Sequence, residues 1–206
     1  MSRLLNLNAD LGESFGPWKM GSDGAMLGIV NSANVACGYH AGDPAVMLKT
    51  VALARDNGVS VGAHPGFPDL QGFGRRRVDI PADELEAMLI YQIGALDACA
   101  KAQGMRVTHV KPHGALSNIA CADRKVADAV ARAVKRLDPT LILLAPAASQ
   151  MILAGREQGL PIVEEVFADR AYLDFNHLYR LNSLLTPRFQ YNICIRFDPF
   201  LLTKAR

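Results

Sequence analysis

Four short clusters of acidic, amide, imidazole and ammonium side chains lie in the first 115 residues, and each directly follows an apolar run. The clusters are residues 8–13, 34–44, 62–69 and 109–114, and they contain four of the five histidines. Carboxylates and imidazoles transfer protons or bind metals, and a lysine stabilises anions. Because active sites of α/β proteins lie where parallel strands end, we expect these clusters to meet in one site.

Each acidic or imidazole candidate has a functional and a structural interpretation. Asp10 and Glu13 together could bind a metal or divide acid and base roles, or Asp10 could cap a turn while Glu13 is solvated. His40 and His64 could each be a general base, a proton carrier or a metal ligand, or each could bond a loop carbonyl. Asp10, His40 and His64 form a plausible divalent-metal set, although no HxH or HExxH spacing requires one.

The last cluster places Lys111 and His113 on one loop. Lys111 could neutralise a carboxylate or a phosphate, or act as a base if it is desolvated, and its alternative is a solvated surface lysine. His109 precedes it within the apolar run, and we interpret it as a structural core histidine. Together, Asp10, His40, His64 and His113 are expected to converge on one pocket.

A glycine- and arginine-rich loop is expected over residues 69–79. Arg75, Arg76 and Arg77 follow Gly-Phe-Gly and could bind an anionic substrate or phosphates, or they could be solvated arginines of a surface turn. The glycines do not match a Walker loop, so nucleotide binding by this segment is only weakly indicated.

Apolar strand-like runs and helical patterns alternate along the chain. We expect strands at residues 4–9, 29–36, 59–63, 106–110, 140–145 and 162–167, and helices at 23–30, 44–57, 81–103, 123–137 and 147–158. Asp43 before Pro44 is a strong helix start. This alternation predicts βαβ units and a mainly parallel sheet, and the missing Rossmann glycines favour a barrel over a doubly wound sheet.

The composition excludes several classes of protein. The chain has 206 residues, of which 50% are hydrophobic, and a net charge of +2, which suits one globular domain and argues against a nucleic-acid partner. No apolar run is long enough for a membrane span, and no secretion signal is recognised. Four cysteines without CxxC spacing suit a reducing compartment, so we expect a soluble cytoplasmic protein.

The sequence changes character near Tyr172. The residues from 173 to 206 contain no glycine and many aromatic and Asn residues. We therefore expect a barrel domain over 1–172 and a divergent tail over 173–206, foreign or frameshifted, that is too short to be a separate domain.

The clusters resemble the LamB/YcsF family. The resemblance rests on residues 8–13, 33–44, 62–65, 68–69, 72–76, 110–116 and 164–172, and covers about residues 3–172. It implies a seven-stranded (β/α) TIM-like barrel of the glycoside hydrolase/deacetylase type, incomplete at the C-terminus. It also implies an ATP-hydrolysing 5-oxoprolinase (EC 3.5.2.9) that opens 5-oxoproline to L-glutamate together with partner subunits B and C.

The resemblance also assigns roles to residues. Catalytic roles are expected for Asp10, His64, Lys111 and His113, with acid-base work for Asp10 and one of the two histidines. Substrate-binding or positioning roles are expected for six others: Glu13, Asn34, His40, Asp43, Arg75 and Arg76. ATP is expected as a co-substrate with Mg²⁺, and a metal on the chain itself would use Asp10, His40 and His64. A homo-oligomer is left open.

Two departures from the family leave other functions open. Ser117 stands where the family usually has Tyr, and the family pattern of a last strand is missing after Tyr172. A barrel without that strand has an exposed edge, which residues 189–197 could cover. The alternatives are a stand-alone metal-dependent deacetylase or amidohydrolase, and an inactive truncated family member.

Overall fold

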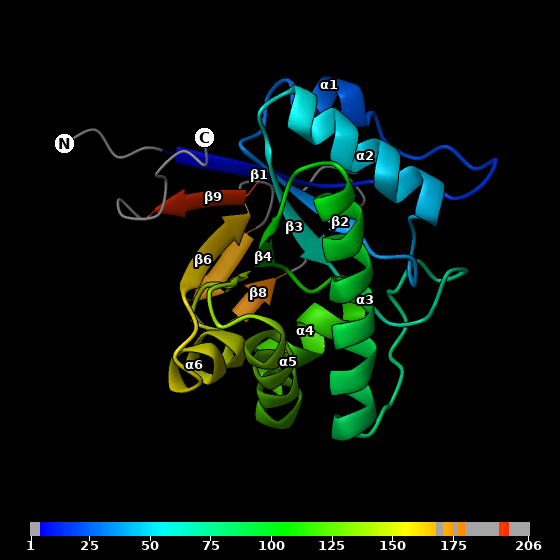
Figure 1. Ribbon diagram of the computed structural model, residues 1–206. Helices are drawn as coiled ribbons and strands as arrows, with labels where there is room; N and C mark the ends of the chain where they lie inside the picture. Colours follow the sequence, from blue (N-terminus) through cyan, green and yellow to red (C-terminus); the bar gives the residue numbers. More distant parts are fainter. Residues whose placement is uncertain (1–4, 168–170, 175–176, 180–193, 198–206) are drawn as a thin grey trace.

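The chain forms a closed barrel surrounded by helices (Figure 1). The computed structural model describes residues 5–167, 171–174, 177–179 and 194–197. The barrel strands, in their order around it, are β1 (Leu5–Leu11), β2 (Ser32–Ala36), β3 (Ser60–His64), β4 (Val107–Val110), β5 (Ile142–Pro146), β6 (Ile162–Phe167) and β9 (Cys194–Phe197). The expected TIM-like (β/α) barrel is confirmed: six strands form its parallel part, and β9 stands where a seventh parallel strand would complete it.

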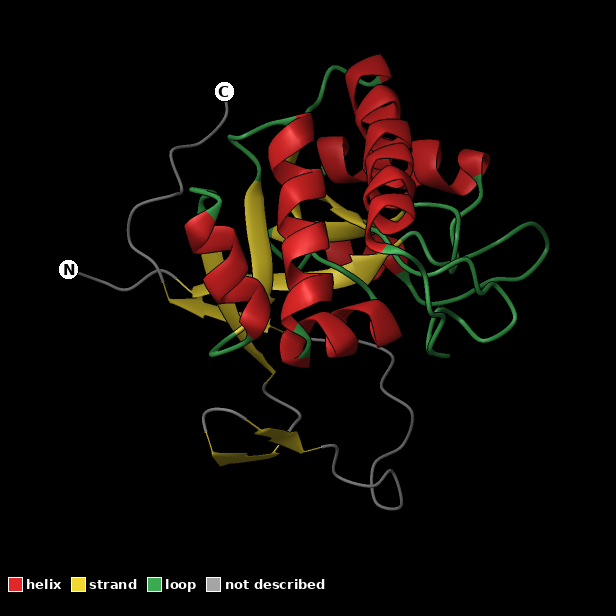
Figure 2. Cartoon of the chain, turned by 90° about the horizontal axis from the view of Figure 1, so that it is seen from below, coloured by secondary structure: helices red, strands yellow, loops and turns green. Residues whose placement is uncertain are grey.

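The first six barrel strands are parallel, and the seventh is not. β9 pairs antiparallel with β1 on one side and with β6 on the other. A parallel return needs a crossover, usually through a helix. The described residues between β6 and β9 instead form a hairpin of β7 (Ala171–Asp174) and β8 (His177–Tyr179), which Figure 2 shows apart from the barrel.

The predicted cover of the open edge falls partly on β9. Its residues 194–197 pair with both edges of the six-stranded sheet, while residues 189–193 of that prediction lie outside the described residues. Backbone hydrogen bonds from one short strand thus close the barrel.

Six helices are described around the strands: α1 (Asp23–Leu27), α2 (Pro44–Asp56), α3 (Ala82–Ala102), α4 (Gly114–Ala122), α5 (Arg124–Leu137) and α6 (Gln150–Glu157). Figure 1 shows α2, α3, α5 and α6 outside the barrel, as right-handed crossovers require. None of the described helices is long and apolar enough to cross a membrane.

Side-chain caps account for the starts of two helices, α2 and α5. The Asp43 carboxylate accepts hydrogen bonds from the Ala45 and Val46 backbone N–H groups at 2.8 and 3.0 Å, and Pro44 opens α2. Asp123 caps α5 in the same way through the Lys125 N–H at 2.8 Å. Both starts were predicted, because an acidic N-cap satisfies N–H groups that the helix leaves free.

Two helix predictions differ from the structure. α4 was not predicted, because its nine residues have no side-chain cap and follow the site loop directly. α6 begins at Gln150 rather than at Ala147, since Ala148 has a φ of 58° and breaks the helical path before the N-cap residue Ser149.

The core lies between the barrel and the helices. The inner face of α5 is small and fully buried, with Ala127, Val130 and Val134 at 0% exposure. Small residues at helical spacing let α5 lie close to α3 and α6, with which it packs. The helices thus hold the strands in fixed positions, and the strand ends place the candidate site.

Candidate active site

The polar clusters meet at one end of the barrel. Asp10 lies near the end of β1, His64 is the last residue of β3, and Lys111 and His113 follow β4. All four side chains are buried, with residue exposures between 1% and 7%. The expectation that successive strand ends converge is therefore met, and the solvated alternative for Lys111 is wrong.

Lys111 lies between two buried carboxylates. Its Nζ is 3.1 Å from Asp10 Oδ1 and 3.4 Å from Glu165 Oε2 on β6. The ammonium also donates to Asn8 Oδ1 at 3.3 Å and lies 5.6 Å from the centre of the Phe167 ring. A buried cation needs such partners because water no longer solvates it.

Asn34 connects the carboxylate to the barrel interior. Its Nδ2 donates to Asn8 Oδ1 at 2.7 Å and to Asp10 Oδ1 at 2.9 Å, and its Oδ1 lies 2.9 Å from His109 Nε2. Asn34 is 0% exposed, so it orients Asp10 within the site. His109 is buried in the core as predicted, and a Cβ at Gly62 would collide with its ring.

Three imidazoles pack together beside Asp10. The rings of His40 and His113 stack with centroids 3.7 Å apart and planes 5° apart, and His64 lies edge-on to both. His64 Nδ1 is 2.6 Å from the Lys111 carbonyl, and His64 Nε2 is 3.3 Å from Asp10 Oδ2. His113 Nε2 is 2.8 Å from the Phe73 carbonyl, and His113 Nδ1 is 2.9 Å from His64 Nε2.

Glu13 faces these rings and is buried with them. Its Oε1 lies 3.5 Å from His40 Nε2 and 3.8 Å from His113 Nδ1, which excludes the solvated alternative for Glu13. Burial, reinforced by the Asp10 charge, raises the pKa of Glu13 to about 8. Burial and the neighbouring imidazoles lower the pKa of His113 to about 3 and hold the pKa of His40 well below its usual value.

A metal could be held by a donor set that differs from the expected one. Among the described residues, ligand atoms of Glu13, His40, His64 and His113 all lie within 4.8 Å of one another. Asp10 is not in this group, although its Oδ2 lies 3.3 Å from His64 Nε2. Three imidazole nitrogens and one carboxylate oxygen are donors that borderline divalent ions accept.

Asp43 and Arg76 are not brought into the cluster. The Asp43 carboxylate accepts from Ala45, Val46 and, at 2.7 Å, the Gly16 N–H, and these bonds lower its pKa. Arg76 pairs with the buried Asp69, whose pKa its hydrogen bonds lower to about 2. Both residues hold loops in place, and their expected contact with substrate stays a prediction.

Arg75 lies closer to the site than Arg76. Its guanidinium carbon is 5.4 Å from the centre of the Phe73 ring, and its charge lowers the pKa of Glu13. Arg77 pairs with the exposed Asp79. The arginine loop thus divides into one residue that faces the site and two that fold the loop or lie on the surface.

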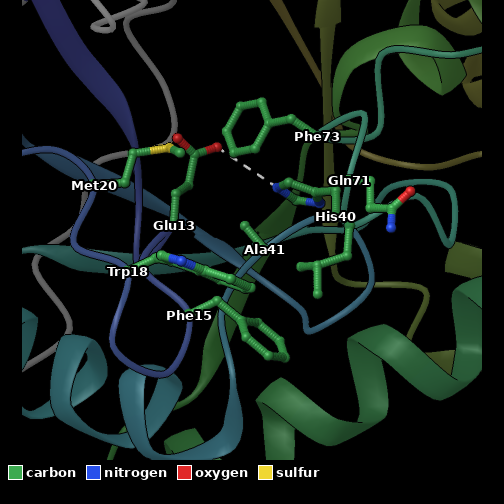
Figure 3. Close-up of a pocket in the computed structure, with 9 residues that line it drawn as sticks. Glu13, Phe15, Trp18, Met20, His40, Ala41, Gln71 and Phe73 are labelled. Atoms are coloured by element: carbon green, nitrogen blue, oxygen red, sulfur yellow. Dashed lines mark ion pairs between the residues drawn. The ribbon is translucent and has the colours of Figure 1, made fainter.

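A cavity of about 190 Å³ opens beside Glu13 and His40 (Figure 3). Its remaining lining is mostly apolar: Phe15, Trp18, Met20, Ala41, Leu70, Gln71 and Phe73. Such a lining, with a few polar groups at one end, is typical of a small-molecule site. Glu13 and His40 are therefore the polar groups of the cluster that an occupant of this cavity would meet.

Sequence reasoning missed Glu165 and the aromatic residues of the cavity. Glu165 lies on the last parallel strand, so the rule that polar residues at strand ends form the site could have found it. Phe15 and Trp18 carry no comparable signal, since polar and apolar residues follow one another in their loop without any regular spacing. Only the folded loop brings them to Glu13.

Fold and site together define a (β/α)-barrel protein with an enzyme-like polar centre at the C-terminal ends of its parallel strands. The model of the LamB/YcsF family matches residues 5–185, and the chain belongs to this family. The resemblance inferred from the motifs is thereby confirmed.

Curated relatives and a solved structure are similar over most of the chain. The A subunit of 5-oxoprolinase from Azoarcus sp. (strain BH72) is 61% identical over 170 residues, covering 82% of this chain and 66% of that protein. The corresponding A subunit of 5-oxoprolinase from Bacillus subtilis (strain 168) is 51% identical over 201 residues, covering 98% and 76%. The chain thus spans about two thirds to three quarters of these two relatives.

A comparison with solved structures agrees with the sequence comparison. The crystal structure of a lactam utilization protein from Thermus thermophilus superposes with a TM-score of 0.82 at 48% identity. The match covers 89% of this chain and 71% of that one.

Proposed function

We propose that this chain is the A subunit of an ATP-dependent 5-oxoprolinase. It would act in the cytoplasm with subunits B and C and hydrolyse 5-oxo-L-proline to L-glutamate. The observation that carries the proposal is the buried Asp10–Lys111–His64 group, in a chain 61% identical to a protein of that name.

The chemistry explains why such a group is needed. A lactam carbonyl is a poor electrophile, and transfer of the ATP γ-phosphoryl to its oxygen makes the ring carbon susceptible to water. Water adds to that carbon, the C–N bond breaks and the ring nitrogen takes a proton, which leaves the phosphoryl group on the new carboxyl. A second water then hydrolyses this acyl phosphate and releases phosphate. The balance is one ATP and two waters in, with glutamate, ADP and phosphate out. Groups that hold anions and move protons accelerate these steps.

Lys111 supplies the fixed positive charge in this proposal. Its ammonium is held by Asp10 and Glu165 and cannot swing into solvent. A preorganised cation stabilises negative charge on a phosphoryl group or an oxyanion without reorientation during the reaction. Asn34 supports it indirectly by orienting the Asp10 carboxylate.

Asp10 and the two histidines supply proton transfer. Asp10 Oδ2 is 3.3 Å from His64 Nε2, which in turn is 2.9 Å from His113 Nδ1. This row of titratable groups leads from Lys111 towards Glu13 and the cavity. Protons can therefore be taken from water and delivered to the leaving ring nitrogen within one buried cluster.

Glu13, His40 and Arg75 are proposed to position the substrate. Glu13 and His40 line the cavity, whose volume of about 190 Å³ suits a small cyclic compound. Arg75, which acts on Glu13 electrostatically, would attract the carboxylate of 5-oxoproline. ATP with Mg²⁺ is proposed as co-substrate of the assembled enzyme.

The proposal is tested by measuring glutamate and ADP formed from 5-oxoproline by this chain with subunits B and C, omitting each protein and ATP in turn. Turnover that requires all components supports the proposal. Lys111→Met should abolish turnover, while Lys101→Met, the same change at an exposed pair with Asp97 on α3, should not. No turnover here, beside an active complex built with a full-length relative in place of this chain, would contradict the proposal.

A second function is favoured by the imidazole cluster. Glu13, His40, His64 and His113 could serve a stand-alone metal-dependent amidohydrolase or deacetylase. That activity would need neither ATP nor a partner protein, and it would be lost with a chelator. The omission series therefore separates the two functions, and a folded chain with neither activity would be an inactive family member.

A further inference from the structure

The hydrogen bonds of two site histidines leave two ring nitrogens in conflict. A carbonyl oxygen only accepts, so His64 must donate Nδ1–H to the Lys111 carbonyl, and His113 must donate Nε2–H to the Phe73 carbonyl. In the neutral rings, His64 Nε2 and His113 Nδ1 then carry lone pairs. These two nitrogens lie only 2.9 Å apart.

Two facing lone pairs repel unless a positive species lies between them. A shared proton is one solution, and it makes one of the two buried imidazoles cationic. A metal ion is the other solution, since it bonds both lone pairs at once. Two nitrogens about 2.1 Å from one tetrahedral ion lie about 3.4 Å apart, so a separation of about half an ångström makes room for it.

His40 gives an independent sign of a missing partner. It is 0% exposed, and within the described part of the chain neither ring nitrogen has a hydrogen-bond partner. Glu13 Oε1 also lacks a hydrogen-bond partner among the described residues, and it lies 3.5 Å from His40 Nε2. Buried polar atoms normally have partners, so these atoms are arranged for a ligand.

We propose that Glu13, His40, His64 and His113 form a binding site for one divalent transition-metal ion of the Zn²⁺ type. The donors are three imidazole nitrogens and one carboxylate oxygen, which Zn²⁺ accepts and Mg²⁺, with its preference for oxygen, does not. When bound, such an ion supplies a Lewis acid for a carbonyl or a water.

The surrounding contacts suit this assignment. Metal-bound histidines usually donate their second N–H to a carbonyl or carboxylate, as His64 and His113 do here. The ligand atoms lie within 4.8 Å of one another, while ligands of one such ion lie at most about 4 Å apart, so a small closing movement completes the site. Binding would occupy the facing nitrogens of His64 and His113, so proton transfer in the metal-bound site would fall to Asp10 rather than to the two histidines.

The test uses tag-free protein, stripped with a chelator and dialysed, and Zn²⁺ as the probe. Isothermal titration and elemental analysis should give one equivalent of Zn²⁺. Co²⁺ in its place should give visible absorption bands that report nitrogen and oxygen ligands. His40→Ala and Glu13→Gln should each weaken Zn²⁺ binding by at least about tenfold.

Asp10→Asn is the matched control, because it removes the nearest carboxylate outside the proposed set without changing its shape. It should weaken Zn²⁺ binding less than Glu13→Gln does, because Asp10 contacts the ligand His64 but is not itself a ligand. Thermal melts of each metal-free variant show that it is folded before its affinity is compared.

Three outcomes would overturn the proposal. Folded protein that takes up no Zn²⁺ would mean that a shared proton joins the two histidines. Asp10→Asn losing affinity as much as Glu13→Gln would mean that the donor set is wrong. Unchanged affinity in His40→Ala would mean that the ion binds elsewhere. None of these measurements depends on turnover, so the 5-oxoprolinase proposal and the metal site can fail separately.

Discussion

The two halves of the buried site differ in how their polar atoms are satisfied. In the half around Asp10, Asn34 and Lys111, ion pairs and hydrogen bonds of 2.7–3.4 Å join the polar side chains to one another. In the half around Glu13 and His40, buried oxygen and nitrogen atoms lack hydrogen-bond partners among the described residues.

This difference gives the two halves different properties: the Asp10 half provides a preformed arrangement of charges, and the Glu13 half provides a place for a ligand. The Asp10 half is held mainly by its own ion pairs and hydrogen bonds, with Glu165 Oε2 in ion-pair but not hydrogen-bond contact, so it can hold charge in a fixed geometry. The Glu13 half leaves polar atoms buried and unpaired, which is unfavourable until something binds them. Substitutions should therefore affect folding in the first half and ligand binding in the second.

Lys111→Met should have the largest effect on stability. It removes the cation that balances Asp10 and Glu165 and leaves two buried carboxylates together. Chemical denaturation should show a loss of about 3–5 kcal/mol in the free energy of unfolding. Lys101→Met, which breaks an exposed ion pair on α3, should change it by about 1 kcal/mol or less. If both substitutions lowered the free energy of unfolding equally, the Asp10 half would not be a preformed arrangement of charges.

His113→Ala should reduce turnover far more than stability. The ring stacks on His40 and links His64 to the loop that carries Phe73. Removing it should lower turnover by about 10²–10⁴-fold. The free energy of unfolding should fall by only about 1–3 kcal/mol, mainly because the Phe73 carbonyl loses its donor. Activity that falls only in proportion to the folded fraction would reject a functional role for His113.

Glu165→Gln should destabilise the protein less than Lys111→Met does. Asp10 still balances the lysine after this change, so one cation and one carboxylate remain. We expect a change of about 1–2 kcal/mol in the free energy of unfolding, from the loss of one buried pair. If Glu165→Gln matched Lys111→Met in denaturation experiments, Asp10 would not be the main counter-charge of the lysine.

Asp69→Asn should have the smallest effect on stability of these substitutions. It should act on the Glu13 half of the site. Asp69 holds the arginine loop through Arg76 and the Gly72 N–H, and this loop carries Phe73. Because the folded pKa of Asp69 is depressed to about 2, its stabilisation is present above pH about 4 and is lost as pH falls towards 2.

Denaturation curves at pH 6, 4, 3 and 2 check this. In Asp69→Asn the stability at pH 6 should be lower, and the loss between pH 4 and 2 should be smaller than in the unsubstituted protein. A parallel loss in both proteins would show that other carboxylates dominate acid unfolding.

Local signals in the sequence predicted the fold well where a single residue type determines the backbone conformation, as at the start of a helix. Asp43 and Pro44 start α2, and Asp123 caps α5, because these preferences act within a few residues. α4 was missed; it directly follows the site loop and, like the predicted α6, has no side-chain cap. The direction of β9 could not be predicted, because it depends on pairing with β1 and β6 from opposite ends of the chain.

The sequence by itself determined the strand–helix order, the barrel class and the side chains available for chemistry, because periodicity and residue type are local properties. Tertiary structure decided which of them act together. It paired Lys111 with Glu165 as well as Asp10, and it placed Glu13 as well as Asp10 beside the imidazoles. It also gave Asp43 and Arg76 hydrogen bonds that hold loops in place. Distances of 3–4 Å between residues up to about a hundred positions apart arise only when the barrel closes.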